Sequence, residues 1–143
     1  MDGKHARATG TVVKRGDRDL LLVETLNAEP GEGSLPRREA LGFWRLTGEI
    51  CDGKCVLGVM RPGKGLAHKA CANICLLGGV PPVLVTTTPV LGMQFLLMGD
   101  AENHALPDAF RDHVAVPRRM EGMLERVGDA LLFRTDVTRA AVP

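Results

Sequence analysis

Short apolar runs separated by Gly- and Pro-containing turns predict a mainly β protein. Two segments near the ends of the chain, 8–23 and 116–135, each contain strand residues, a Gly-Asp turn and a second strand. This is the pattern of a β-hairpin. A third hairpin is predicted from the uncharged runs 82–87 and 94–98, and a further strand from 46–50.

One helix interrupts this pattern in mid-chain, at 67–77, where alanine and leucine predominate and Gly78-Gly79 ends the run. A second short helix is predicted at 106–113. Five or six strands with one short inserted helix predict a small OB-like antiparallel barrel. We expect residues 1–42 to form an N-terminal hairpin and polar linker, and residues 43–143 to form the OB-like metal-binding domain.

Composition narrows the functions that this barrel can have. The 143 residues carry 18 basic and 17 acidic side chains, for a net charge of +1, and aromatic residues make up only 3%. Nucleic-acid modules of this fold need a basic groove with aromatic stacking platforms. We therefore expect no nucleic-acid partner, although such a module remains the alternative reading. Ser34 is the only serine, which disfavours serine-hydrolase chemistry.

The N-terminus has no apolar segment typical of a secretory signal. Residues 70–99 contain no charge, but they include Gly78-Gly79, Pro81-Pro82 and Pro89, which a spanning helix does not combine. We therefore expect no membrane-spanning segment and, for the chain as given, a cytoplasmic location.

All four cysteines lie between positions 51 and 75, together with one histidine, in the order Cys51, Cys55, His68, Cys71, Cys75. On a helix, the last three occupy one face. Three thiolates and an imidazole fill a tetrahedral zinc site, and iron or an iron–sulfur cluster takes similar ligands. Cys51 is either a substitute ligand or an independent buried thiol. Two other readings remain open: dithiol chemistry at Cys71 and Cys75, and thiols that only pack in the core.

The basic residues around these thiols also bear on the site. Lys54 and Lys69 are the two that we expect to support the ligands or to dock a partner, because nearby positive charge favours thiolates.

The segment resembles a poorly characterised family of small bacterial proteins with barrel domains, often exported or membrane-attached, and the resemblance covers roughly residues 43–137. The matching positions are Asp52, Lys54, Cys55, Gly58, Met60, Pro62, Gly63, Gly65, His68, Cys71, Ala72, Cys75, Gly78, Gly79, Pro81 and Pro82. The resemblance supports the barrel and the ligands Cys55, His68, Cys71 and Cys75. It implies an aliphatic residue at the position of Cys51, which makes Cys51 the weakest ligand candidate. The chain departs from the family in lacking an export or membrane segment at its N-terminus, and the family brings no established reaction.

Together these features predict a metal-binding Cys₃His domain, with zinc expected before iron or an iron–sulfur cluster. Four protein ligands leave no open position for substrate, so a structural or electron-transfer role is expected before an enzymatic one. We expect such a domain to be an accessory subunit of a larger redox or membrane-associated system, and to meet a protein partner there. Any contact with a membrane would then be made through that partner.

Overall fold

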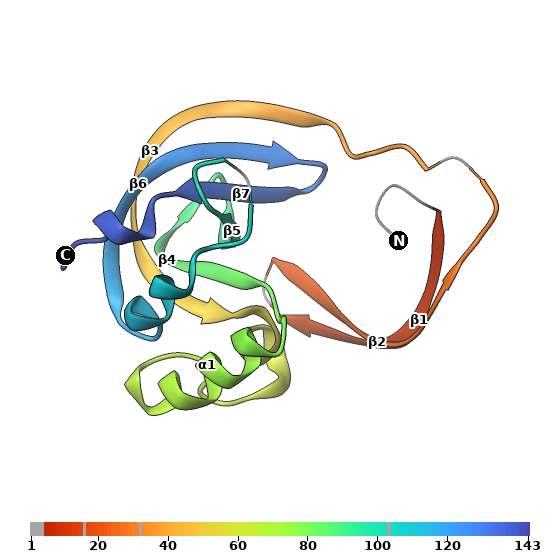
Figure 1. The fold of residues 1–143 in the computed structure, drawn as a ribbon, viewed down its shortest axis with the longest axis horizontal. Helices are drawn as coiled ribbons and strands as arrows, with labels where there is room; N and C mark the ends of the chain where they lie inside the picture. The colour runs from red at the N-terminus through yellow and green to blue at the C-terminus, as the bar shows by residue number, and fades with distance from the viewer. Residues whose placement is uncertain (1–4, 16, 32, 103) are drawn as a thin grey trace.

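The computed structural model describes residues 5–143 except 16, 32 and 103. The chain begins with a two-stranded hairpin, β1 (Ala6–Arg15) and β2 (Arg18–Ala28), which lies beside the rest of the molecule (Figure 1). Its contact with the body includes β1 against the turn that follows β3, where Val13 approaches the Cα of Gly58. The predicted N-terminal hairpin is confirmed, and both of its strands are longer than expected.

Five further strands close into a barrel in the order β3-β4-β5-β7-β6. Their bounds are β3 (Arg38–Asp52), β4 (Pro82–Val90), β5 (Met93–Gly99), β6 (Pro117–Val127) and β7 (Ala130–Thr135). Four of the neighbouring pairs are antiparallel, whereas β5 and β7 run parallel. The predicted OB-like barrel is confirmed.

Alternation along β3 separates two apolar clusters. Leu46 and Ile50 point into the barrel, where they meet Leu84, Leu124 and Phe133 in the main core. Cys51 points to the other side of the strand and joins a smaller cluster, formed by Cys51, Val56, Leu57, Val83, Val85 and Phe95, against which Leu20 of the hairpin packs. Asp52 lies two residues after Ile50, on the same face of β3, and is fully buried.

Two glycines let neighbouring strands approach closely. A Cβ at Gly48 of β3 would overlap the carbonyl oxygen of Val85, and a Cβ at Gly122 of β6 would overlap that of Arg134. Each glycine stands two positions before an aliphatic residue of the main core, Ile50 and Leu124. At these two positions neighbouring strands pack against each other without a side chain.

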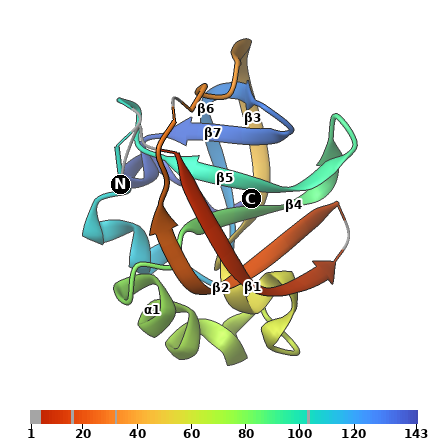
Figure 2. The same ribbon diagram turned by 90° about the vertical axis from the view of Figure 1, so that its right-hand side faces the viewer.

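An insertion joins β3 to β4 at one end of the barrel (Figures 1 and 2). It contains the turn η1 (Cys55–Val59), the short 3₁₀ turn η2 (Leu66–His68) and the helix α1 (Lys69–Leu77). The predicted helix is therefore confirmed. Two further 3₁₀ turns, η3 (Asp108–His113) and η4 (Val137–Arg139), precede β6 and follow β7.

The polar linker expected within residues 1–42 lies between β2 and β3 and ends before residue 42. β2 continues to Ala28 and β3 already begins at Arg38, because β3 pairs with β6 from Arg38 onward. The expected division at 42/43 falls within β3, and the assignment of two domains stays a prediction.

Candidate metal centre

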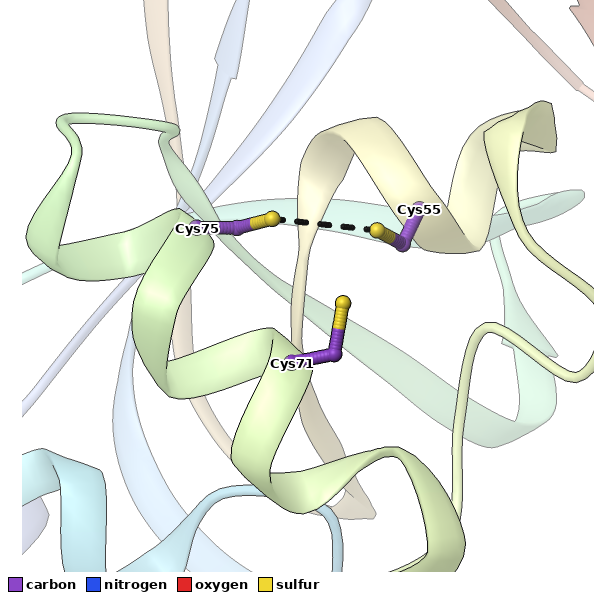
Figure 3. A group of neighbouring side chains, drawn as sticks. All are labelled: Cys55, Cys71 and Cys75. Carbon is purple, nitrogen blue, oxygen red and sulfur yellow. Dashed lines mark hydrogen bonds between the residues drawn. The ribbon is translucent and has the colours of Figure 1, made fainter.

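Three thiols converge where the insertion folds back on the end of β3. The sulfurs of Cys55, Cys71 and Cys75 all lie within 4.8 Å of one another. Figure 3 shows them pointing toward a common point, Cys55 from η1 and the other two from successive turns of α1. Cys55 is buried, whereas Cys71 and Cys75 are half-buried. The three residues can hold a metal ion.

Cys55 Sγ and Cys75 Sγ are 3.8 Å apart. A disulfide would require about 2.05 Å, so no disulfide joins these two cysteines in the structure. Two sulfurs that each lie about 2.3 Å from one ion at a tetrahedral angle are separated by about 3.8 Å. The spacing therefore fits ligands that share a single ion.

A second group adjoins the first at Cys55. Ligand atoms of Asp52, Cys55 and His68 also lie within 4.8 Å of one another, and all three residues are buried. Asp52 Oδ2 is 3.0 Å from His68 Nε2, and Asp52 Oδ1 accepts a hydrogen bond from the Cys55 backbone N–H at 2.8 Å. One carboxylate thus fixes both the imidazole and the backbone that carries Cys55.

The local sequence explains this arrangement. Asp52 ends β3, and its side chain accepts the N–H of the residue three positions later, as an N-cap residue does at the start of a helix. His68 lies in η2, directly before α1, so its side chain enters from the same element that supplies Cys71 and Cys75. The structure places His68 beside Cys55 and in contact with Asp52, outside the group that the three thiols form.

Cys51 belongs to neither of these groups. Its thiol donates to Glu49 Oε1 at 3.5 Å and packs in the smaller apolar cluster. Glu49 also accepts the backbone N–H of Gly65, which ties the loop before α1 to β3. Cys51 and Asp52 lie on opposite faces of β3. The geometry therefore favours the interpretation of Cys51 as an independent buried thiol.

Burial determines the protonation of the thiols. Removal from water raises the pKa of Cys55, and the carboxylate of Asp52 and the neighbouring Cys75 raise it further. Burial also raises the pKa of Cys75, and the pKa of Cys51 rises through burial and the nearby Glu49. Without a cation the thiols of Cys55 and Cys75 are therefore neutral at pH 7, and a bound metal ion would replace their protons.

The raised pKa of Cys55 also weighs against a nucleophilic Cys–His–Asp site. Such a site needs a thiolate stabilised by positive charge or by a helix N-terminus, with a lowered pKa. At Cys55 both the burial and the neighbouring carboxylate raise the pKa. Asp52, Cys55 and His68 are the residue types of a nucleophilic triad, but the surroundings of Cys55 do not stabilise a thiolate.

The two lysines expected near the site take different positions. Lys54 lies between Asp52 and Cys55 and its side chain is exposed. Lys69 Nζ donates to the carbonyl oxygen of Asp112 at 2.8 Å, which ties the start of α1 to η3. Lys69 therefore anchors the helix that carries two of the thiols.

No role was predicted for Asp52 from the sequence, although Asp52 is one of the positions that match the bacterial family. Its position three residues before Cys55, at the end of an apolar strand, is typical of a capping carboxylate. Its contact with His68 depends on the fold of the insertion, which local spacing does not encode.

A further group, Asp100, Glu102 and His104, lies on the loop after β5. His104 is 75% exposed and its Nδ1 is 3.6 Å from Asp100 Oδ2. This group is open to water on a surface loop, in contrast to the buried centre beside α1.

No protein-family model, curated protein or solved structure matches the chain. Among the described residues, no helix has the length and apolar character needed to cross a bilayer.

Proposed function

We propose that this chain is a zinc-binding accessory domain in which Cys55, Cys71, Cys75 and His68 hold one ion. The observation that carries the proposal is the convergence of three thiols within 4.8 Å, adjoined through Cys55 by a buried histidine. Thiolate and imidazole are the ligands that structural zinc sites use.

The Asp52–His68 pair supports the choice of His68 as the fourth ligand. A histidine that binds a metal usually donates its other ring N–H to a carboxylate, which sets its tautomer and orientation. Asp52 Oδ2 accepts at His68 Nε2, which leaves Nδ1 for the ion. Asp52 is thus a positioning residue in this proposal.

A single ion is favoured over an iron–sulfur cluster by the spacing of the thiols. In a four-iron cluster each cysteine binds a different iron, and in a two-iron cluster at most two cysteines share one, so three cysteine sulfurs of a cluster do not all lie as close together as three that share one ion. The sulfurs of Cys55, Cys71 and Cys75 all lie within 4.8 Å of one another. The 3.8 Å between Cys55 Sγ and Cys75 Sγ suits the single ion. With four protein ligands the site has no open position, which supports a structural role rather than catalysis.

The ion would connect η1 to α1 and thereby fix the insertion on the barrel. α1 has only nine residues, no side-chain N-cap and one fully buried side chain, Ala72, and a helix of this length is marginal by itself. The zinc would stabilise α1 on the barrel, which the few apolar contacts of this helix do not do by themselves. With the insertion ordered in this way, the domain would offer a surface to a protein partner, which is the accessory role that we propose.

Cobalt substitution tests the ligand set. Co²⁺ bound by three thiolates and an imidazole in a tetrahedral site gives intense visible bands, and the sulfur-to-cobalt absorption in the near ultraviolet scales with the number of thiolates. We expect a spectrum of three thiolates that the Cys51→Ser variant retains and the Cys71→Ser variant loses. A weak spectrum typical of octahedral cobalt would contradict the proposal.

A further inference from the structure

Two of the three thiols at this centre are also placed to bond to each other. Cys55 Sγ and Cys75 Sγ are 3.8 Å apart and point toward each other, one from η1 and the other from α1 (Figure 3). The two residues are twenty positions apart in the sequence, so a disulfide between them would tie the helix to the turn. This is the connection that the zinc ion makes in the proposed function.

The other pair on successive turns, Cys71 and Cys75, is less suited to a disulfide. Both residues lie on α1, and Cβ atoms one helical turn apart are separated by about 5–6 Å. A disulfide requires Cβ atoms about 3.5–4.5 Å apart, so this bond would unwind a turn of the helix. It would also leave α1 without a crosslink to η1. The geometry therefore favours Cys55 as the partner of Cys75.

Within the favoured pair, Cys75 is the thiol that an oxidant can reach from solvent. Cys75 is half-buried, whereas Cys55 is only 3% exposed. A cysteine bound to zinc is a thiolate, and the thiolate is the form that reacts with a disulfide. The first attack therefore occurs at Cys75, and Cys55 lies close enough to complete the bond.

We propose that Cys55 and Cys75 form a reversible disulfide that replaces zinc in holding α1 on η1, with a small disulfide such as oxidised glutathione as the oxidant. The Cys75 thiolate attacks one sulfur of oxidised glutathione, and one glutathione thiolate leaves. The Cys55 thiolate then attacks Cys75 Sγ, and the second glutathione thiolate leaves. Two electrons pass from the cysteines to glutathione, and the zinc is released because only Cys71 and His68 remain as protein ligands.

The release of zinc in this inference rests on the proposed function, whereas the disulfide can also form in the metal-free chain. The insertion would stay ordered with either the ion or the disulfide in place. Only the reduced, metal-free chain would lose the order of α1. Oxidation would therefore remove zinc from the domain without unfolding its inserted helix.

The test begins with the metal-free chain, equilibrated with mixtures of reduced and oxidised glutathione, alkylated and digested with trypsin. Lys54 separates Cys51 from Cys55 in the digest, so the two thiols fall on different peptides. We expect mass spectrometry to find peptide 55–64 linked to peptide 70–111. In concentrated guanidinium this preference should disappear, because the fold no longer holds the two sulfurs together.

Three variants identify the pair. Cys71→Ser should form the disulfide as the parent does, since it leaves Cys55 and Cys75 in place. Cys55→Ser leaves only the strained pair within α1, and its equilibrium constant for disulfide formation should be about tenfold lower or more. Cys51→Ser is the matched control, because it removes a buried thiol outside the centre, and it should behave as the parent does.

The second part of the test uses the zinc-loaded chain. Oxidised glutathione should release one zinc for each disulfide formed, as measured with a chromophoric chelator, and reduction with dithiothreitol should restore zinc binding. The oxidised, zinc-free chain should melt at a higher temperature than the reduced, zinc-free chain. A chain that binds no zinc would contradict the proposed function, and the disulfide found in the metal-free chain would still decide the choice of Cys55 and Cys75.

Three results would overturn the proposed disulfide. The first is a main product that links Cys71 to Cys75 or contains Cys51. The second is a folded, metal-free chain whose thiols all stay reduced in oxidised glutathione alone. The third is a zinc-loaded chain that forms the disulfide between Cys55 and Cys75 and still holds its zinc.

Discussion

Replacing Asp52 with asparagine should weaken zinc binding without removing a ligand. Asp52 is fully buried and its two oxygens have different partners, the Cys55 N–H at 2.8 Å and His68 Nε2 at 3.0 Å. Asparagine has nearly the same shape and retains one carbonyl oxygen for the Cys55 N–H. Its amide nitrogen would then face His68 Nε2, so two donors would oppose each other.

The imidazole can relieve that conflict by moving its proton to Nδ1, which is the nitrogen that the proposal assigns to zinc. Loss of a carboxylate behind a metal-binding histidine typically costs 10- to 100-fold in affinity, which corresponds to about 1.4–2.7 kcal/mol. Competition against a chromophoric zinc chelator would measure this loss directly.

Asp100→Asn provides a matched control, because Asp100 also contacts a histidine, the exposed His104, 3.6 Å away on the loop after β5. We expect this variant to bind zinc as tightly as the parent. If Asp52→Asn and Asp100→Asn have the same affinity as the parent protein, the assignment of Asp52 as the positioning residue for His68 is wrong.

Three further predictions concern the thiols and the helix. Cys71→Ser should lose zinc and lower the melting temperature, whereas Cys51→Ser should do neither; equal zinc loss from both would show that Cys51 is a ligand. The metal-free protein should lose stability as the pH rises above about 8.5, the ordinary thiol value. The raised pKa values of Cys55, Cys75 and Cys51 mean that the folded state holds protons that the unfolded chain releases. Chemical denaturation at a series of pH values would measure this, and a metal-free protein that is more stable at pH 10 than at pH 7 would contradict it. Removal of zinc by a chelator should increase amide hydrogen exchange in α1 far more than in the barrel strands; uniform protection before and after chelation would show that the ion does not order the helix.

The strand pattern, the inserted helix and the grouping of three thiols could be predicted from the sequence, because each is a local property. Short apolar runs between turn residues predicted the barrel strands, and the one-turn spacing of Cys71 and Cys75 placed both on one side of α1. Cys51 and Cys55, by contrast, look alike in the sequence. Only the alternation of β3 and the turn at η1 separate them, sending one thiol to the smaller apolar cluster and the other to the centre.

Contacts between residues that are far apart in the sequence could not be predicted from local patterns. β3 begins at Arg38 within a polar, Pro-containing segment because it pairs with β6, some eighty residues later in the chain, and that pairing outweighs local preference. The contact between Asp52 and His68 likewise depends on how the insertion folds, because the two residues are sixteen positions apart.

Metal analysis of the protein purified without air, combined with its visible spectrum, is the direct test of the zinc site. We predict one zinc per chain and no visible colour, with the zinc lost from Cys55→Ser, Cys71→Ser and Cys75→Ser. A brown protein containing iron and sulfide, or a folded chain that takes up no metal even with zinc in excess, would contradict it.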